Sequence, residues 1–146
     1  MKVINKQAHF DYELGERVEA GVELTGAEAK SCMLGQVEMG QAQVRIRPNK
    51  FGGTEAWIWN LQIFPYKHAD NAGYDPKRPR RLLLHQKEIT DLNIRMRQTN
   101  RLLVPTAMYT KSDRVKVELA LARGKKKYEK REAIKKREER KNGGFI

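Results

Sequence analysis

Apolar and polar residues alternate along several short stretches of this chain. Segments 17–24 (RVEAGVEL), 42–47 (AQVRIR) and 115–122 (VKVELALA) each place an apolar side chain at every second position. A period of two is that of a β-strand with one face buried and the other in water. Glu19 falls on the polar face of the first segment, and Lys116 falls on that of the last. The alternation therefore predicts three strands and the outward direction of both side chains.

Two further segments contain residues that favour strands. Segment 55–64 places Trp57 and Trp59 on one face. Segment 102–109 is apolar, but Pro105 has no N–H to donate, so we expect this strand at a sheet edge or with a bulge. Between the two lies a proline-containing connection, 65–81, which we expect to be irregular.

Only two helices are predicted before the C-terminal quarter of the chain. Segment 26–35 is short and ends at Gly35, whereas segment 85–98 repeats Ile89, Leu92 and Met96 at helical spacing. Several short strands with few helices are typical of a small β-barrel or β-sandwich. Barrels of the OB type present one sheet face and its loops to RNA.

The last 22 residues, 125–146, differ from the rest in composition. They contain ten Lys or Arg and four Glu, and they therefore carry half of the chain's net charge of +12. Good helix formers dominate, but no apolar stripe is present, so a helix here is marginal without a partner. Two interpretations stay open: a solvated tail with no specific task, or a segment that folds on a polyanion.

The overall balance of charge favours a nucleic-acid partner. The sequence pI is about 10.0, and the basic tail lacks the large apolar residues that attachment to a membrane surface requires. We expect no secretory signal and no membrane span. The single Cys32 excludes an internal disulfide and fits a reducing cytoplasm.

Catalytic and metal-binding chemistry is not expected. His9, His68 and His85 are widely separated, and one cysteine does not supply a thiolate cluster. Gly35 and Gly40 have the spacing of a phosphate loop, but Gln41-Ala42 follow where Lys-Ser/Thr is required. One enzymatic alternative stays open, a ribonuclease that combines His9 or His85 with Glu19. We expect no cofactor.

Basic residues cluster at two places beside the predicted strands. The first cluster, Lys77–Arg81, includes Arg78 and Arg80, which we take as candidate RNA-binding residues. The second is Lys125–Lys127, followed by Tyr128, whose ring could stack on a base. Each cation alone is typical of a solvated surface, but their concentration favours RNA.

Seven stretches of the chain resemble one protein family in the same order. They are NKQAHFDY (5–12), VEAGVEL (18–24), GAEAKS (26–31), DPKRPRRLLLHQKEI (75–89), LVP (103–105), VKVELALARGKK (115–126) and YEKRE (128–132). This set resembles the SmpB family of SsrA-binding proteins, the bacterial partners of transfer-messenger RNA. The resemblance covers nearly the whole chain.

The resemblance implies a mainly β fold with two or three short helices. The fold expected is an OB-like closed or partly open β-barrel of about six strands, formed by residues 1–124. A basic C-terminal tail, residues 125–146, is expected to be disordered in the free protein and helical on the ribosome.

The resemblance also implies an adapter rather than an enzyme. The core would bind the tRNA-like domain of transfer-messenger RNA, which elongation factor Tu carries in its alanine-charged form. The complex would enter stalled ribosomes for trans-translation, with the tail in the empty messenger channel near the decoding centre. We expect a cytoplasmic monomer. The alternative is a structural ribosomal protein, which would share the basic charge, the small barrel and the tail.

Individual residues carry over from the family in two groups. In the core, the RNA-binding positions are Asn5, His9, Glu19, Leu82 and Lys116, although Leu82 fits a core position equally well. In the tail, Gly124 corresponds to the hinge after the last strand, and the residues expected to act on the ribosome are Lys125, Lys126, Tyr128, Glu129, Lys130 and Arg131. The last three match an acid-Lys-Arg triplet that the family links to tagging.

Overall fold

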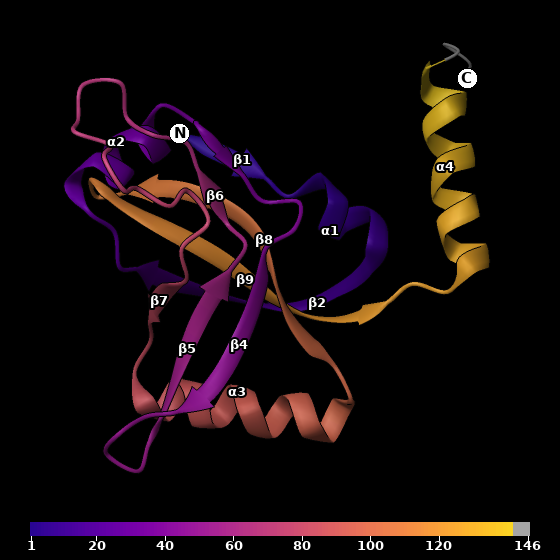
Figure 1. Cartoon of the computed structure of the whole chain (residues 1–146). Coiled ribbons are helices and arrows are strands. Elements are labelled where there is room, and N and C mark those ends of the chain that lie inside the picture. The colour runs from indigo at the N-terminus through magenta and orange to yellow at the C-terminus, as the bar shows by residue number, and fades with distance from the viewer. Residues whose placement is uncertain (142–146) are drawn as a thin grey trace.

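The computed structural model describes residues 1–141, which form nine strands and four helices (Figure 1). The strands are β1 (Lys2–Ile4), β2 (Tyr12–Val22), β3 (Val37–Glu38), β4 (Gln43–Pro48), β5 (Thr54–Trp59), β6 (Gln62–Ile63), β7 (Arg80–Leu83), β8 (Leu102–Lys111) and β9 (Arg114–Gly124). The helices are α1 (Lys6–Asp11), α2 (Gly26–Met33), α3 (Gln86–Thr99) and α4 (Lys127–Lys141).

Seven strands form one antiparallel sheet in the order β1-β8-β9-β2-β7-β5-β4, and β3 pairs with β6 separately. This confirms a mainly β fold with several short helices. The sheet curves so that β4 packs against β8, but no strand pairing joins its two edges within residues 1–141. The main sheet has seven strands where about six were expected.

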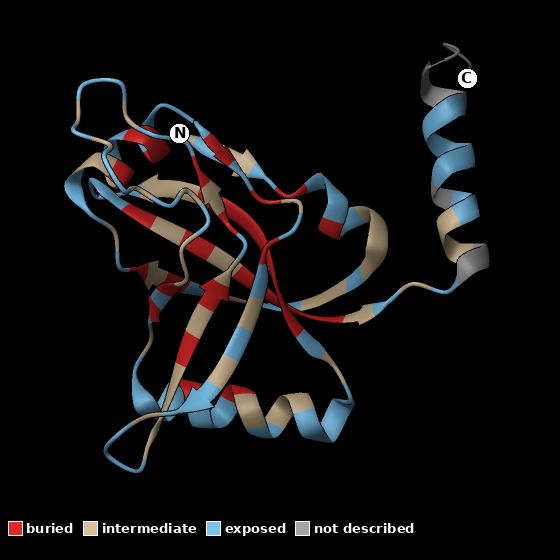
Figure 2. Cartoon of the chain, viewed as in Figure 1, coloured by how far each residue is buried: buried red, intermediate tan, exposed pale blue. Residues whose placement is uncertain are grey.

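The predicted alternation determines which side chains enter the core. Ala20 and Val22 of β2 are buried and Glu19 is exposed, while β9 buries Val115, Val117 and Leu119. In β8 the register shifts between Pro105 and Ala107, so the bulge that Pro105 predicted is present. Figure 2 shows buried residues along the sheet and mostly exposed ones along α4.

Four elements were not predicted: β1, α1, β7 and the two-residue β3. The first two are short, and α1 begins where the Asn5 Oδ1 accepts a hydrogen bond from the Ala8 N–H at 3.1 Å. The third lies at the end of the connection expected to be irregular. In β7, Arg80 and Leu82 are buried while Arg81 and Leu83 are exposed. This pattern departs from the alternation of apolar and polar residues because an arginine occupies a core position.

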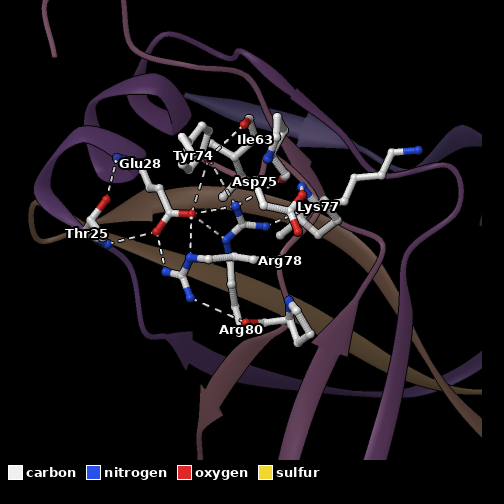
Figure 3. Close-up of polar contacts among 11 residues, drawn as sticks. Thr25, Glu28, Ile63, Tyr74, Asp75, Lys77, Arg78 and Arg80 are labelled. Atoms are coloured by element: carbon white, nitrogen blue, oxygen red, sulfur yellow. Dashed lines mark hydrogen bonds and ion pairs between the residues drawn. The ribbon is translucent and has the colours of Figure 1, made fainter. Parts of the chain in front are cut away.

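A buried carboxylate accounts for that arginine. Glu28 in the first turn of α2 is 1% exposed, and Figure 3 shows it facing Arg78 and Arg80. Its Oε2 accepts from Arg80 Nε at 2.7 Å and from Arg78 Nε at 3.2 Å. Its Oε1 accepts from the Thr25 N–H at 3.0 Å, which completes the capping box of α2.

Arg80 itself is wholly buried and fully engaged. Nη1 donates to the Leu61 carbonyl at 2.7 Å, and Nη2 donates to the Tyr74 hydroxyl and to the Pro76 carbonyl, each at 3.1 Å. The network therefore ties α2, the turn between β5 and β6, the connection before β7 and β7 itself to one carboxylate. Burial favours the neutral acid, but hydrogen bonds from Arg78, the Thr25 N–H and Arg80 outweigh it and lower the pKa of Glu28 to about 2.

We expect Glu28→Gln to lower the free energy of unfolding by about 3 to 5 kcal/mol, because the change leaves the Arg80 guanidinium buried without a counter-charge. Urea unfolding followed by circular dichroism measures this. The matched control is Glu23→Gln, since the Glu23 side chain is exposed. Equal stability of the two variants would show that the buried pair does not support the fold.

The stability of the unsubstituted protein should also depend on pH through Glu28. Its folded-state pKa of about 2 lies below the unfolded value of about 4.3, so the stabilisation is complete above pH 4.3 and is lost as the pH falls towards 2. Urea unfolding over this range should show the unsubstituted chain and Glu28→Gln converging as the pH falls. A constant gap between them would contradict the assignment.

Candidate nucleic-acid interface

A groove of about 630 Å³ lies on the outer face of the sheet, where β2, β7 and β9 meet the start of α3. It brings together two of the predicted positions, Glu19 and Lys116. Arg81 and Arg114 add two more cations to its walls, and Leu83 adds an exposed apolar side chain. The groove therefore combines three Lys or Arg side chains and three carboxylates, those of Glu19, Glu88 and Asp113, with apolar surface.

Glu19 is held in its charged form. The Tyr109 hydroxyl donates to its Oε2, and Lys111 Nζ lies 3.5 Å from the same oxygen. The hydrogen bond from Tyr109, followed by the charges of Lys111 and Lys116, lowers the pKa of Glu19. Burial, followed by the same hydrogen bond, raises the pKa of Tyr109 to about 12. Glu19 thus presents a fixed acceptor in the groove.

Lys116 projects from β9 on the face that the alternation predicted. It lies opposite Gly21 of β2 and Tyr109 of β8 in the strand register. The Leu83 side chain packs over Gly21, where an added Cβ would lie 3.2 Å from the Leu83 Cβ. Nothing in the described geometry gives Lys116 a carboxylate within 4.0 Å, so its charge faces the groove.

Three predicted RNA-binding side chains instead serve the core. Arg80 is 0% exposed and Leu82 is 1% exposed, so neither has surface to offer to RNA. Arg78 is partly exposed, but its guanidinium is paired with Glu28. Direct contact by Arg80 is therefore corrected to a structural role, because its counter-charge, Glu28, lies on α2, 52 positions earlier in the chain. Leu82 takes the core position that the sequence had left open.

The two N-terminal positions divide between core and surface. Asn5 is buried, and its Nδ2 donates to the Pro105 carbonyl at 2.8 Å and to the Met39 carbonyl at 3.2 Å. Asn5 therefore holds α1 against β8 and supplies no surface of its own. His9 lies at the surface. Partial desolvation of its ring by neighbouring residues, followed by the charge of Arg17, lowers the pKa of His9.

The sheet passes directly into the tail at Gly124. The Lys125 N–H donates to the Asp11 carbonyl at 2.8 Å, and Lys125 Nζ donates to the His9 carbonyl at 3.1 Å. A Cβ at Gly124 would meet nothing within 4 Å, so no steric requirement for glycine exists at the predicted hinge. Lys126 follows as an exposed residue.

Two members of the predicted triplet pair with the core. Glu129 lies 3.3 Å from Arg123 of β9, and Lys130 Nζ lies 3.3 Å from Asp11 Oδ1. Further along α4, the Arg137 guanidinium lies 5.5 Å from the centre of the Phe10 ring. Arg131 is exposed. Tyr128 belongs to α4, but its side chain lies outside the described part of the chain, as do residues 142–146 of the predicted tail.

Of the residues that the ribonuclease alternative requires, the structure brings together only His85 and Glu19. His85 and Glu19 line the same groove, whereas His9 lies by Arg17 and Lys125. A carboxylate with a lowered pKa is a weaker base, so Glu19 is poorly suited to remove a proton.

Within residues 1–141, no group of three or more His, Cys, Asp or Glu side chains is placed to hold a metal ion. No helix in the described range has the length and apolarity to cross a membrane.

Comparison with known proteins gives one consistent match. The family model described as "SmpB protein" matches residues 2–143. The SsrA-binding protein of Malacoplasma penetrans is 41% identical over 136 residues, 93% of this chain and 90% of the relative. That of Trichodesmium erythraeum is 46% identical over 137 residues, 93% and 85%. The structure resembles a solved chain described as "tmRNA-SmpB: a journey to the center of the bacterial ribosome", with a TM-score of 0.67, 38% identity, and coverage of 91% of this chain and 94% of that chain.

We expect Tyr109→Phe to raise the pKa of the Glu19 carboxyl, because the substitution removes the hydrogen bond that lowers it most. A carbon-detected NMR titration of the Glu19 side chain measures the change. Tyr66→Phe is the control, since Tyr66 packs against His68 and Lys30, outside the groove. An unchanged Glu19 titration in Tyr109→Phe would mean that the hydroxyl does not bind this carboxylate in solution.

Proposed function

Because the chain belongs to the SmpB family of SsrA-binding proteins, we propose that it binds the tRNA-like domain of transfer-messenger RNA and delivers it to stalled ribosomes for trans-translation. The observation that carries this proposal is the single groove that unites Glu19 and Lys116. The protein acts as an RNA-binding adapter and not as an enzyme.

The groove suits a folded RNA better than a bare polyanion. Lys116, Arg81 and Arg114 can neutralise phosphates, whereas the charged Glu19 repels them and accepts hydrogen bonds from base or ribose donors. RNA recognition by shape needs this mixture, because A-form grooves are recognised through backbone and 2′-hydroxyl positions. Simple charge attraction would not require a fixed carboxylate in the site.

The core fulfils its role as an OB-like barrel of residues 1–124, partly open between β4 and β8. The packing of β4 against β8 supports this arrangement, since it brings the two sides of the curved sheet together. The outer face of the barrel then carries the groove, and its interior carries the apolar core.

The tail, residues 125–146, acts on the ribosome. Its fifteen-residue helix α4 has no apolar stripe, so it is marginally stable in free solution and becomes fully helical in the messenger channel. Its pairs with Arg123 and Asp11 are partly exposed and therefore weak. Ribosomal phosphates can replace these carboxylates, which frees the triplet near the decoding centre.

Further partners follow from the same role. Elongation factor Tu meets this protein through the charged transfer-messenger RNA, and the protein acts as a cytoplasmic monomer without a cofactor. A structural ribosomal protein is the less favoured alternative, because the full-length relatives are SsrA-binding proteins.

The division between core and tail is tested by removing residues 125–146. We expect the truncated chain to bind the tRNA-like fragment nearly as tightly as the full chain, since every residue that lines the groove precedes residue 125. Tagging in a reconstituted translation system should be abolished. Gel-shift titration and peptide tagging measure the two outcomes, and circular dichroism verifies the fold.

The matched control is Lys116→Glu in the full chain, which should lose preference for the tRNA-like fragment over an arbitrary hairpin of equal length. If truncation and Lys116→Glu weaken RNA binding equally, the core and the tail do not have separate roles.

A further inference from the structure

A second cationic surface lies on the outer face of β4 and β5. Alternation buries Ala56 and Ile58 on the inner side of β5, so Trp57 and Trp59 face outwards. Arg45 and Arg47 of β4 are exposed on the same side. We name these four side chains the Arg–Trp face.

Each arginine of this face covers one indole ring. The Arg47 guanidinium lies 4.3 Å from the centre of the Trp57 ring, and that of Arg45 lies 5.2 Å from the centre of the Trp59 ring. Both pairs are diagonal in the register of the β4–β5 ladder. A planar guanidinium against an aromatic ring keeps N–H donors at its edge free for phosphate. Both indole Nε1 atoms are shielded and make no hydrogen bond within the described residues.

The hairpin that ends this face is held in place. Asn49 Oδ1 accepts from the N–H groups of Phe51 and Gly53, each at 2.9 Å, and leaves the Phe51 side chain 93% exposed. Gln86 of α3 exchanges two hydrogen bonds with Thr54, at 3.0 and 2.8 Å. The turn is therefore preorganised, and it presents an aromatic ring to solvent beside the Arg–Trp face.

Positive charge exceeds negative charge on this surface. Arg47 lies 3.5 Å and Arg81 lies 3.9 Å from the two carboxylate oxygens of Glu55, which is the acidic residue of β5. The Arg47 and Arg81 side chains remain 45% and 50% exposed. Arg45 donates to the neutral Gln43 amide oxygen at 3.2 Å, and no carboxylate pairs with it among the described residues. One carboxylate thus faces three arginines.

We propose that the Arg–Trp face, extended by Phe51, binds unpaired RNA. The exposed Phe51 ring and the guanidinium planes that cover Trp57 and Trp59 offer stacking surfaces for bases, and the excess cations complement the phosphates. Paired RNA keeps its bases inside the helix and gains nothing from these rings. Arg81 lines both this face and the groove that holds Glu19, so one outer surface carries two kinds of RNA contact. The inference goes beyond the proposed function and does not require it.

Tryptophan fluorescence tests the inference directly. The chain has two tryptophans, and both belong to the Arg–Trp face, so their emission reports on this surface. The probe is an unstructured RNA of roughly 12 nucleotides, within the length that small β-barrel proteins cover. We expect saturable quenching of the full chain by this RNA. A blunt RNA duplex of equal length and inorganic polyphosphate should quench far less.

The charged half of the face is tested with Arg45→Gln/Arg47→Gln. This variant should bind the unpaired RNA about tenfold more weakly, and the slope of log affinity against log salt should decrease by about 1.4, or 0.7 for each lost phosphate contact. The control is Lys87→Gln/Arg97→Gln, which removes two exposed cations from α3 and should change affinity much less. Unfolding midpoints verify that both variants are folded.

Two outcomes would overturn the inference: RNA binding without a change in tryptophan emission, or equal quenching by duplex and polyphosphate. The Lys116→Glu variant separates this result from the proposed function. It should lose preference for the tRNA-like fragment but retain quenching by the unpaired RNA. Loss of both in this variant would mean that the Arg–Trp face is no independent site.

Discussion

The pairing of Glu28 with Arg78 and Arg80 is the interaction on which the rest of the structure depends. Burying an ion pair adds little net stability compared with apolar residues, but leaving either partner alone is costly, so such a pair determines one arrangement. Here it places Arg80 inward, and the alternation of β7 then buries Leu82 and turns Arg81 and Leu83 outwards. Those two outward side chains line the groove beside Glu19. A carboxylate in the interior therefore determines part of the outer surface that we propose for RNA.

Periodicity predicted the long strands well, because each buries one face against a continuous core. The outward directions of Glu19 and Lys116 and the bulge near Pro105 followed from the same reasoning. The roles of Arg78 and Arg80 did not, because a run of cations indicates surface unless its counter-charge is known. That counter-charge lies 50 and 52 positions away in the chain. The strand β7 was missed for the same reason. Helix α1 was missed because its six residues have no apolar stripe and depend on the Asn5 N-cap instead.

The outer surface and α4 use charge in different ways. In the groove, Glu19 is fixed by Tyr109 among cations, an arrangement with the directionality that shape recognition requires. Along α4, the described pairs with the core are single, partly exposed contacts that salt or phosphate can displace. Strong preorganisation thus belongs to the sheet, and exchangeable pairing belongs to the helix.

The contacts of α1 connect the two ends of the polypeptide. The Asn5 amide donates to the Met39 and Pro105 carbonyls and lies at the start of α1. The last residues of α1 then contact the tail through the His9 carbonyl, the Phe10 ring, and the carbonyl and carboxylate of Asp11. Contacts with the first dozen residues therefore help to set the direction in which α4 leaves the sheet. The neutral Asn5 side chain therefore helps to position a cationic tail that begins more than a hundred residues later.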